Sequence, residues 1–107
     1  MAKIFVSYAA EDKIIAQLVT QTLRSAGFVV FESSTSLLPG GEIHEEINDQ
    51  ILNCNIFVFL ISPDSVRRKK YTLSELKIAC EKWPNPVCHI LPVIIRNTDK
   101  EDIPACA

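Results

Sequence analysis

The sequence predicts an α/β fold in which one parallel sheet lies between two layers of helices. Short apolar runs alternate with helical patterns along the chain, in the order βαβαβαβ. The connections between them are short, and strands joined by helical crossovers run parallel with both faces covered. One run, residues 55–62, is apolar almost throughout, which is typical of a strand buried on both faces. The 107 residues are enough for one domain with one hydrophobic core.

The first half of the chain supplies two strands and a helix between them. Residues 3–8, KIFVSY, contain β-branched and aromatic residues and predict the first strand. Residues 11–26 predict a helix, because their apolar positions follow helical spacing, and Gly27 stands where a helix C-cap glycine belongs. Residues 28–32, FVVFE, are the next strand, and residues 33–41, SSTSLLPGG, predict an exposed loop. The apolar positions of this helix are Ile14, Ile15, Leu18, Val19 and Leu23.

A second helix follows the loop, with Ile43, Ile47 and Ile51 on one stripe and acidic residues in its first turn. The buried strand of residues 55–62 comes next, and then the loop PDSVRRKK. We expect Ser62, Asp64 and Ser65 in this region to cap the following turn, or alternatively to bind a ribose or a phosphate.

The third helix lies within residues 69–83 and carries two different faces. One is an apolar stripe, formed by Leu73, Leu76, Cys80 and Trp83. Tyr71 and Glu75 are four residues apart and share another face. The prolines of WPNP end the helix, and residues 89–96, HILPVIIR, form a fourth strand. Pro92 argues against a fully paired central position for that strand.

The position of Tyr71 and Glu75 in such a fold raises the possibility of a binding site. In an open parallel sheet, ligands bind outside the carboxyl ends of the strands. The helix that carries Tyr71 and Glu75 starts at that same edge, so Glu75 can face a crevice there. An exposed helical glutamate and a packing tyrosine are the simpler interpretation of the same two residues.

Composition and charge exclude several classes of protein. Hydrophobic residues make up 48% and charged residues 22%, which is typical of a globular domain. No apolar run approaches the roughly 18 residues that span a bilayer, and no signal peptide is visible, so we expect a cytoplasmic protein without a membrane segment. The basic cluster of residues 67–70, RRKK, lacks interleaved aromatics, so no nucleic-acid partner is expected. It predicts a solvated loop or a contact with the acidic face of another copy.

The four cysteines show no paired spacing. They are Cys54, Cys80, Cys88 and Cys106, and none forms a CxxC motif. We therefore expect reduced thiols and no metal site.

Four segments, taken in order, resemble the Toll/interleukin receptor (TIR) domain in its bacterial form. FVSYAAED is similar to the first strand and turn of that family, and VFESSTSLLPGGEI to its second strand and BB loop. VFLISPDS is similar to its third strand, and YTLSELKIA to the helix with an aromatic residue four positions before a glutamate. The resemblance implies a flavodoxin-like three-layer fold. The family usually continues with another helix and strand, so we expect residues 1–107 to be a single TIR-like domain, the main part of a domain from a longer chain.

The resemblance also implies an activity, because enzymatic members of the family cleave NAD+ at the nicotinamide–ribose bond. Glu75 matches the catalytic glutamate and Tyr71 matches the aromatic residue that lines the nucleotide site. Tyr8 and Ala9 match the end of the first strand beside the pocket, and Ser62 is a further candidate for nucleotide binding. NAD+ is then a substrate, no cofactor is needed, and the products are nicotinamide with ADP-ribose or a cyclic ADP-ribose. A role in bacterial immune signalling is expected.

The BB loop implies a second kind of site. Leu38, Pro39 and Gly40 match its tip, which in the family packs against a neighbouring domain. Leu37 and Leu38 cost solvation free energy unless they pack somewhere. We therefore expect self-association through this loop to control activity.

Two alternatives remain open from the sequence. The first is a non-enzymatic TIR adaptor, which needs no carboxylate at Glu75. The second is a phosphoacceptor receiver domain, which needs an acidic pair directly after the first strand and an aspartate at the end of the third. Here Glu11 and Asp12 arrive late and the third strand ends at Ser62, so the receiver interpretation is disfavoured.

Overall fold

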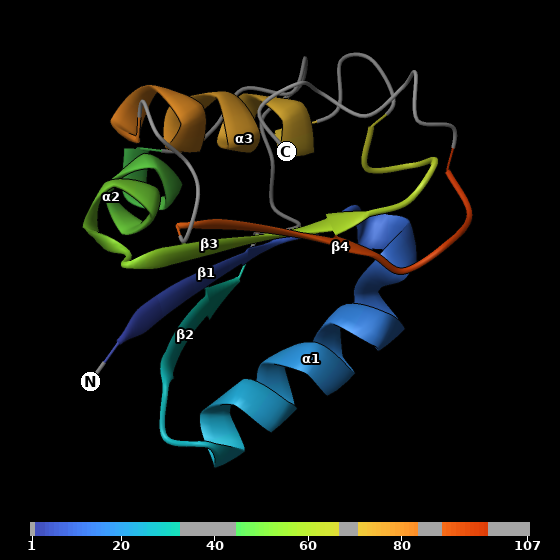
Figure 1. Cartoon of the computed structure of the whole chain (residues 1–107), viewed down its shortest axis with the longest axis horizontal. Helices are drawn as coiled ribbons and strands as arrows, with labels where there is room; N and C mark the ends of the chain where they lie inside the picture. Colours follow the sequence, from blue (N-terminus) through green and yellow to red (C-terminus); the bar gives the residue numbers. More distant parts are fainter. Residues whose placement is uncertain (1, 33–44, 67–70, 84–88, 99–107) are drawn as a thin grey trace.

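The computed structural model describes residues 2–32, 45–66, 71–83 and 89–98, with the backbone alone for residues 45–48 and 71–74. In these ranges the elements are β1 (Lys3–Ser7), η1 (Ala10–Asp12), α1 (Lys13–Ser25), β2 (Val29–Glu32), α2 (Glu45–Asn53), β3 (Ile56–Ile61), α3 (Tyr71–Lys82) and β4 (Ile90–Ile94). The four strands form one parallel sheet in the order β2-β1-β3-β4. Helices α2 and α3 cover one face and α1 covers the other (Figure 1). The predicted three-layer α/β class is therefore confirmed.

Two apolar clusters fill the space on either side of the sheet. Phe5, Phe57 and Phe59 point toward α2 and α3, where they meet Ile51, Leu76 and Ala79. Because side chains alternate along a strand, the residues between them point to the other face. That second cluster consists of Ile4, Val6, Tyr8, Ala16, Val30, Val58 and Leu60. Strand β3 is buried on both faces, as its unbroken apolar run predicted.

Helix α1 ends shortly before Gly27, where the sequence predicted a C-cap glycine. Gly27 has φ of +96°, which a glycine adopts without the steric penalty of a Cβ atom. The Gly27 amide donates to the Arg24 carbonyl at 3.0 Å, and the Phe28 amide donates to the Leu23 carbonyl at 3.2 Å. These two bonds satisfy carbonyls that the helix end leaves open, in the Schellman pattern.

The apolar stripe predicted for the first helix is partly wrong. The side chains of Ile14 and Leu18 are 78% and 62% exposed, whereas Ala16 and Thr20 face the sheet. Residues 10–12 form a separate 3-10 turn, so α1 starts at Lys13 and not at the predicted residue 11. Because each residue advances a helix by about 100°, the small inward side chains Ala16 and Thr20 leave Ile14 and Leu18 on the outer side.

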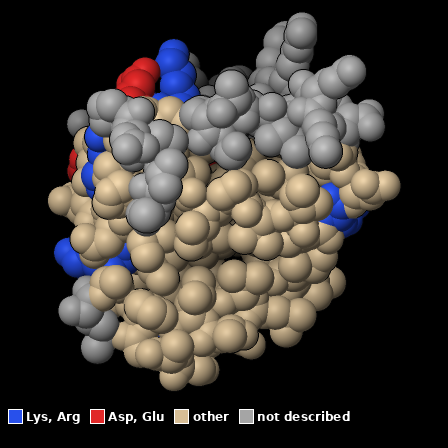
Figure 2. All heavy atoms as spheres, viewed as in Figure 1, with Lys and Arg blue, Asp and Glu red and all other residues tan. Residues whose placement is uncertain are grey.

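Among the strands of the described residues, β4 lies at the edge of the sheet, next to β3 only. Pro92 is compatible with that position because an edge strand has unpaired amides on one side. Leu91, Val93 and Ile94 are largely exposed although the segment is apolar throughout. The described part of the surface seen in Figure 2 carries its Lys, Arg, Asp and Glu side chains mainly toward the rim.

Candidate functional site

The carboxyl ends of β1 and β3 define the place where a site is expected. The chain places β2 on one side of β1 and β3 on the other, so the strand order reverses between β1 and β3. Ligands of open α/β sheets bind at such a reversal, outside the carboxyl ends. Tyr8, Ala9 and Ser62 directly follow these two strands, so three of the predicted residues lie at this edge.

Glu75 is brought to the same edge by α3. Its carboxylate Oε1 accepts a hydrogen bond of 2.6 Å from the hydroxyl of Ser7, the last residue of β1. Glu75 and Ser7 are both 0% exposed. The distance is typical of a hydroxyl that donates to an ionised carboxylate, which is stronger than a neutral hydrogen bond. Glu75 is thus a buried, directed carboxylate and not one of the solvated surface residues of its helix.

Tyr8 and Ala9, which follow Ser7 in the chain, are also buried, with exposed fractions of 3% and 0%. Burial raises the pKa of Tyr8 above its ordinary value of 10.0, and the negative charges of Glu32 and Glu75 raise it further. The raised pKa of Tyr8 therefore indicates that the negative charge of Glu75 acts on the Tyr8 phenol at the end of β1. The neutral phenol persists well into the alkaline range.

A polar cluster joins the ends of β1, β3 and β4 next to these residues. The Ser62 hydroxyl donates to Oδ2 of buried Asp12 at 2.5 Å. Arg96 Nε lies 3.1 Å from Oδ1 of Asp12, and another guanidinium nitrogen of Arg96 pairs with Asp64. These two carboxylates, with the Asp64 hydrogen bond foremost, raise the pKa of Arg96. Arg96 therefore stays a cation that holds two acidic side chains together.

The Ser62 side chain is also part of a turn. The Ser65 amide donates to Ser62 Oγ at 3.1 Å, and the Ser62 amide donates to Ser65 Oγ at 2.9 Å. This reciprocal pair resembles a capping box, so Ser62 and Ser65 cap the turn after β3. The hydroxyl of Ser62 would have to exchange its bond to Asp12 before it could bind a ribose.

Sequence reasoning missed Ser7 and Asp12 as members of this edge, and it placed Arg96 there only as the end of the fourth strand, without its contact to Asp12. Ser7 carried a usable signal, because it is a polar residue two positions after Phe5 on a strand whose inward positions are apolar. The contact between Asp12 and Arg96 had no such signal in the sequence, because only the fold brings the turn after β1 beside the end of β4.

The remaining predicted residues are only partly placed. Tyr71 is the first residue of α3, one turn before Glu75, and its side chain is outside the described part. Leu37, Leu38, Pro39 and Gly40, the predicted interface, lie outside the described residues. The basic cluster of residues 67–70 also lies outside them.

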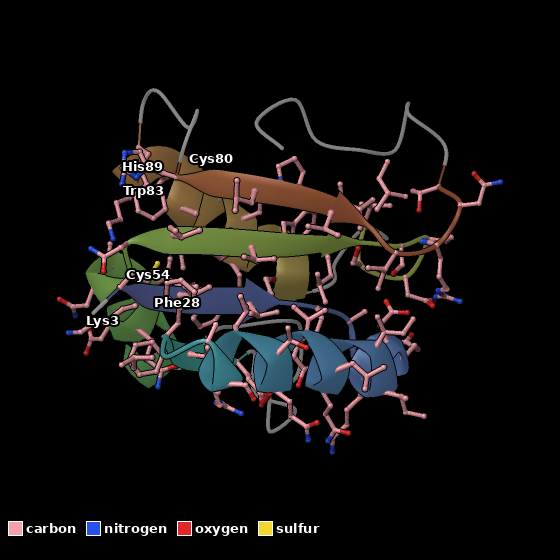
Figure 3. All side chains as sticks on the ribbon, turned by 60° about the horizontal axis from the view of Figure 1, so that its bottom comes forward. Lys3, Phe28, Cys54, Cys80, Trp83 and His89 are labelled. Atoms are coloured by element: carbon pink, nitrogen blue, oxygen red, sulfur yellow. The ribbon has the colours of Figure 1, made fainter. Side chains whose placement is uncertain are left out.

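The far end of α3 has a structural role. Trp83 packs against the core, as its place on the apolar stripe predicted, and stacks on His89 with ring centroids 5.0 Å apart. Figure 3 shows the two rings side by side at the start of β4. Lys82 Nζ lies 4.3 Å from the Trp83 ring centroid and donates to the carbonyls of Ile51 and Cys54.

The expectation that all cysteines are reduced is wrong for Cys80, which is disulfide-bonded. Spacing along the chain does not show which thiols a fold brings together, so the sequence could not reveal this bond. Cys54 is a free thiol, and burial raises its pKa above the ordinary 9.0. Within the described residues, no group of three His, Cys, Asp or Glu side chains could hold a metal ion. No helix of the described ranges is long and apolar enough to cross a membrane.

Comparisons with known proteins agree with this architecture. A family model described as the TIR domain matches residues 4–106. The fold is similar to that of a metazoan TIR-STING receptor from C. gigas, with a TM-score of 0.71 and 23% identity. The match covers 96% of this chain and 34% of the receptor, so the chain spans about a third of that protein.

A second similar structure is the TIR domain of the Toll-related receptor TRR-2 from Hydra magnipapillata. It has a TM-score of 0.71 and 23% identity, and the match covers 98% of this chain and 77% of the other. No curated protein matches the sequence. The family match extends over nearly the whole chain and the two solved structures share its fold, so the chain belongs to the TIR domain family.

Proposed function

We propose that this TIR domain cleaves NAD+ at the nicotinamide–ribose bond, with Glu75 as the catalytic carboxylate. The observation that carries the proposal is the placement of Glu75. It is a fully buried carboxylate at the carboxyl edge of the sheet, held by Ser7 of β1, and its charge raises the pKa of Tyr8. Buried, directed carboxylates at such an edge are candidates for catalysis, since structure alone rarely requires them there.

The reaction suits a site with a single carboxylate. Most glycosidases need one acid to protonate the leaving group and a second carboxylate for the cationic sugar. The nicotinamide ring of NAD+ already carries a positive charge, so it leaves as a neutral molecule without a proton. Glu75 would accept hydrogen bonds from the ribose hydroxyls and stabilise the positive charge that develops on the ribose. Water as acceptor gives ADP-ribose, and the adenine of the same molecule gives a cyclic product.

Complete burial has a consequence for control. Ser7, Ala9, Ser62 and Glu75 have no exposed surface in the isolated chain, and Tyr8 has 3%. A dinucleotide reaches Glu75 only if the structure around it moves. We propose that self-association through Leu37, Leu38, Pro39 and Gly40 favours the open state, which makes turnover depend on protein concentration. The cellular role would be cytoplasmic signalling in bacterial immunity.

The same burial favours a second candidate function, that of a non-enzymatic TIR scaffold. A carboxylate that is fully enclosed and bonded to Ser7 can also serve packing alone. In that case binding to other TIR domains is the whole activity, and Glu75 is needed only for folding.

Nicotinamide release, followed by chromatography at high protein concentration, distinguishes the two functions. The wild-type chain is compared with Glu75→Gln and with Glu81→Gln, which changes an exposed glutamate of the same helix. For an NAD+ hydrolase or cyclase, release is lost in Glu75→Gln and retained in Glu81→Gln, and the second product peak identifies the acceptor. No release from the wild type, even after fusion to a self-assembling partner, would instead support the scaffold.

Control by association has its own test. Release per molecule should rise with protein concentration and fall in Leu38→Asp, while the monomer keeps its melting temperature. Constant specific activity over a hundredfold range of concentration would exclude this control and leave the assignment of Glu75 unaffected.

A further inference from the structure

The direction of Ser7 follows from the alternation of β1. Phe5 points to the face covered by α2 and α3, where it shares a cluster with Leu76 and Ala79 of α3. Ser7 is two positions later and therefore points to the same face. Glu75 directly precedes Leu76 on α3. The side chains of Ser7 and Glu75 therefore meet where α3 crosses the end of β1.

A hydroxyl at this position needs a reason. Ser7 is fully buried in a strand whose other inward side chain, Phe5, belongs to the apolar core. A buried hydroxyl lowers stability unless it is hydrogen-bonded, and alanine would fill nearly the same volume without that cost. The bond of 2.6 Å to Glu75 Oε1 is the compensation that the structure provides.

We infer that Ser7 is a positioning residue for Glu75, which fixes the carboxylate at the edge of the sheet and favours its ionised form. A carboxylate has little rotational freedom once one oxygen is held from a rigid strand, so its second oxygen, Oε2, is also fixed in direction. Ser7 does not touch the substrate in this role. The inference rests on the proposed function, since positioning matters for catalysis only if Glu75 is catalytic.

The effect of Ser7 on Glu75 must be distinguished from the effects of other charged groups nearby. Within the described structure, the charges of Glu32 at the end of β2 and of Glu75 act on Tyr8, the residue after β1. Tyr8 ionises above its ordinary value of 10.0 and does not titrate on the acid side. Glu32→Gln is the control for the charge of Glu32, which also acts on Tyr8.

The test is the pH profile of nicotinamide release in Ser7→Ala and Ser7→Thr. Loss of a hydrogen bond to the charged form makes a carboxylate easier to protonate. In Ser7→Ala the acid limb of the profile should move up by roughly one pH unit, with kcat lowered about tenfold and KM little changed. Ser7→Thr keeps the hydroxyl and should restore the wild-type limb, even if its extra methyl group lowers the melting temperature.

A matched variant separates positioning from stability. Thr20 is another buried hydroxyl, on α1, whose Oγ1 donates to the Gln17 carbonyl. Thr20→Val removes that bond far from Glu75, so it should change stability without moving the acid limb. Equal limbs in Ser7→Ala and the wild type would overturn the inference and assign Ser7 to packing alone.

A second measurement does not depend on turnover. The 13C resonance of the Glu75 carboxyl can be followed by NMR against pH, without NAD+, in the wild type and in Ser7→Ala, Ser7→Thr and Thr20→Val. An upward move of its midpoint in Ser7→Ala and recovery in Ser7→Thr would support the contact even if no NAD+ is cleaved, and the proposed function alone would then fail. An unmoved midpoint would reject the contact whatever the activity.

Discussion

Ser62 and Asp12 are 50 positions apart in the chain, and the Ser62 hydroxyl donates to the Asp12 carboxylate at 2.5 Å. Arg96 binds the other oxygen of Asp12 at 3.1 Å, so a single carboxylate joins the end of β3 to the residues that follow β4. Because Asp12 belongs to the turn after β1, the contact also fixes the entrance of α1. The candidate site thus lies against a polar frame, by which we mean the contacts of Asp12 with Ser62 and Arg96.

Asp12→Ala should therefore lower the free energy of unfolding by about 1–3 kcal/mol, since it leaves the buried Ser62 hydroxyl without its acceptor. Denaturant titration at neutral pH measures this change. The control is Asp49→Ala, which removes an exposed carboxylate on α2 and should change stability by under about 0.5 kcal/mol. Equal effects of the two substitutions would show that the frame adds no stability.

Phe57→Ala should be among the most destabilising single changes in the chain. The Phe57 ring is fully buried and stacks on Phe5, with ring centroids 5.6 Å apart and an interplanar angle of 4°. Removing it leaves a cavity in the core under α2 and α3, at a cost of about 3–5 kcal/mol. Phe28→Ala is the matched control, because Phe28 is 37% exposed at the start of the β2 segment. A melting temperature lowered equally by both changes would contradict the assignment of the core.

Lys82→Met should weaken the packing of α2 on α3. Lys82 Nζ donates to the Ile51 carbonyl at 3.1 Å and to the Cys54 carbonyl at 2.5 Å, at the end of α2 where carbonyls lack helical partners. Methionine keeps the stem and loses the cation that satisfies them, which should cost about 1–2 kcal/mol. Amide hydrogen exchange of residues 49–54 should accelerate in this variant. Lys77→Met, at an exposed position of α3, should leave that exchange unchanged.

Stability should fall in alkaline solution because of Tyr8. The pKa of Tyr8 is raised in the folded state above the ordinary 10.0, so above that pH the unfolded chain releases a proton that the folded chain retains. This contribution is fully present below pH 10 and is lost as the pH rises toward the folded value. In Tyr8→Phe the decline of the unfolding free energy above pH 10 should be shallower, as measured by urea titration between pH 8 and 11. The pKa of Cys54 is also raised, from 9.0, so both proteins should carry Cys54→Ala in this comparison.

Much of the fold followed from the sequence because it depends on local patterns. The unbroken apolar run of β3, the glycine after α1 and the proline of β4 each report a local requirement of burial, backbone angle or edge position. The outer face of α1 did not follow. Ile14 and Leu18 have helical spacing, but spacing gives a stripe without saying which neighbour covers it.

The candidate site was predictable in its location and not in its contacts. The end of β1 and the helix of Glu75 were expected at one edge, because parallel strands present their carboxyl ends together. The hydrogen-bond partner of Glu75 could not be predicted, because it depends on how α3 packs on β1. That packing brings together residues 68 positions apart in the chain. The pairing of Asp12 with Arg96 likewise depends on how β4 sits beside β3, which no local pattern of residues encodes.

Glu75 and Leu76 are neighbours on α3, one bonded to Ser7 and the other part of the apolar core beneath it. A genetic selection that scores only a downstream phenotype would therefore give the same result for loss of the carboxylate and for loss of the core beside it. Cellular abundance of each variant, measured in parallel, would separate them, because Leu76→Ala should deplete the protein while a folded Glu75→Gln should persist at wild-type levels. For residues of this helix, the effect of a substitution on the phenotype therefore reports on catalysis only after it is corrected for the amount of protein in the cell.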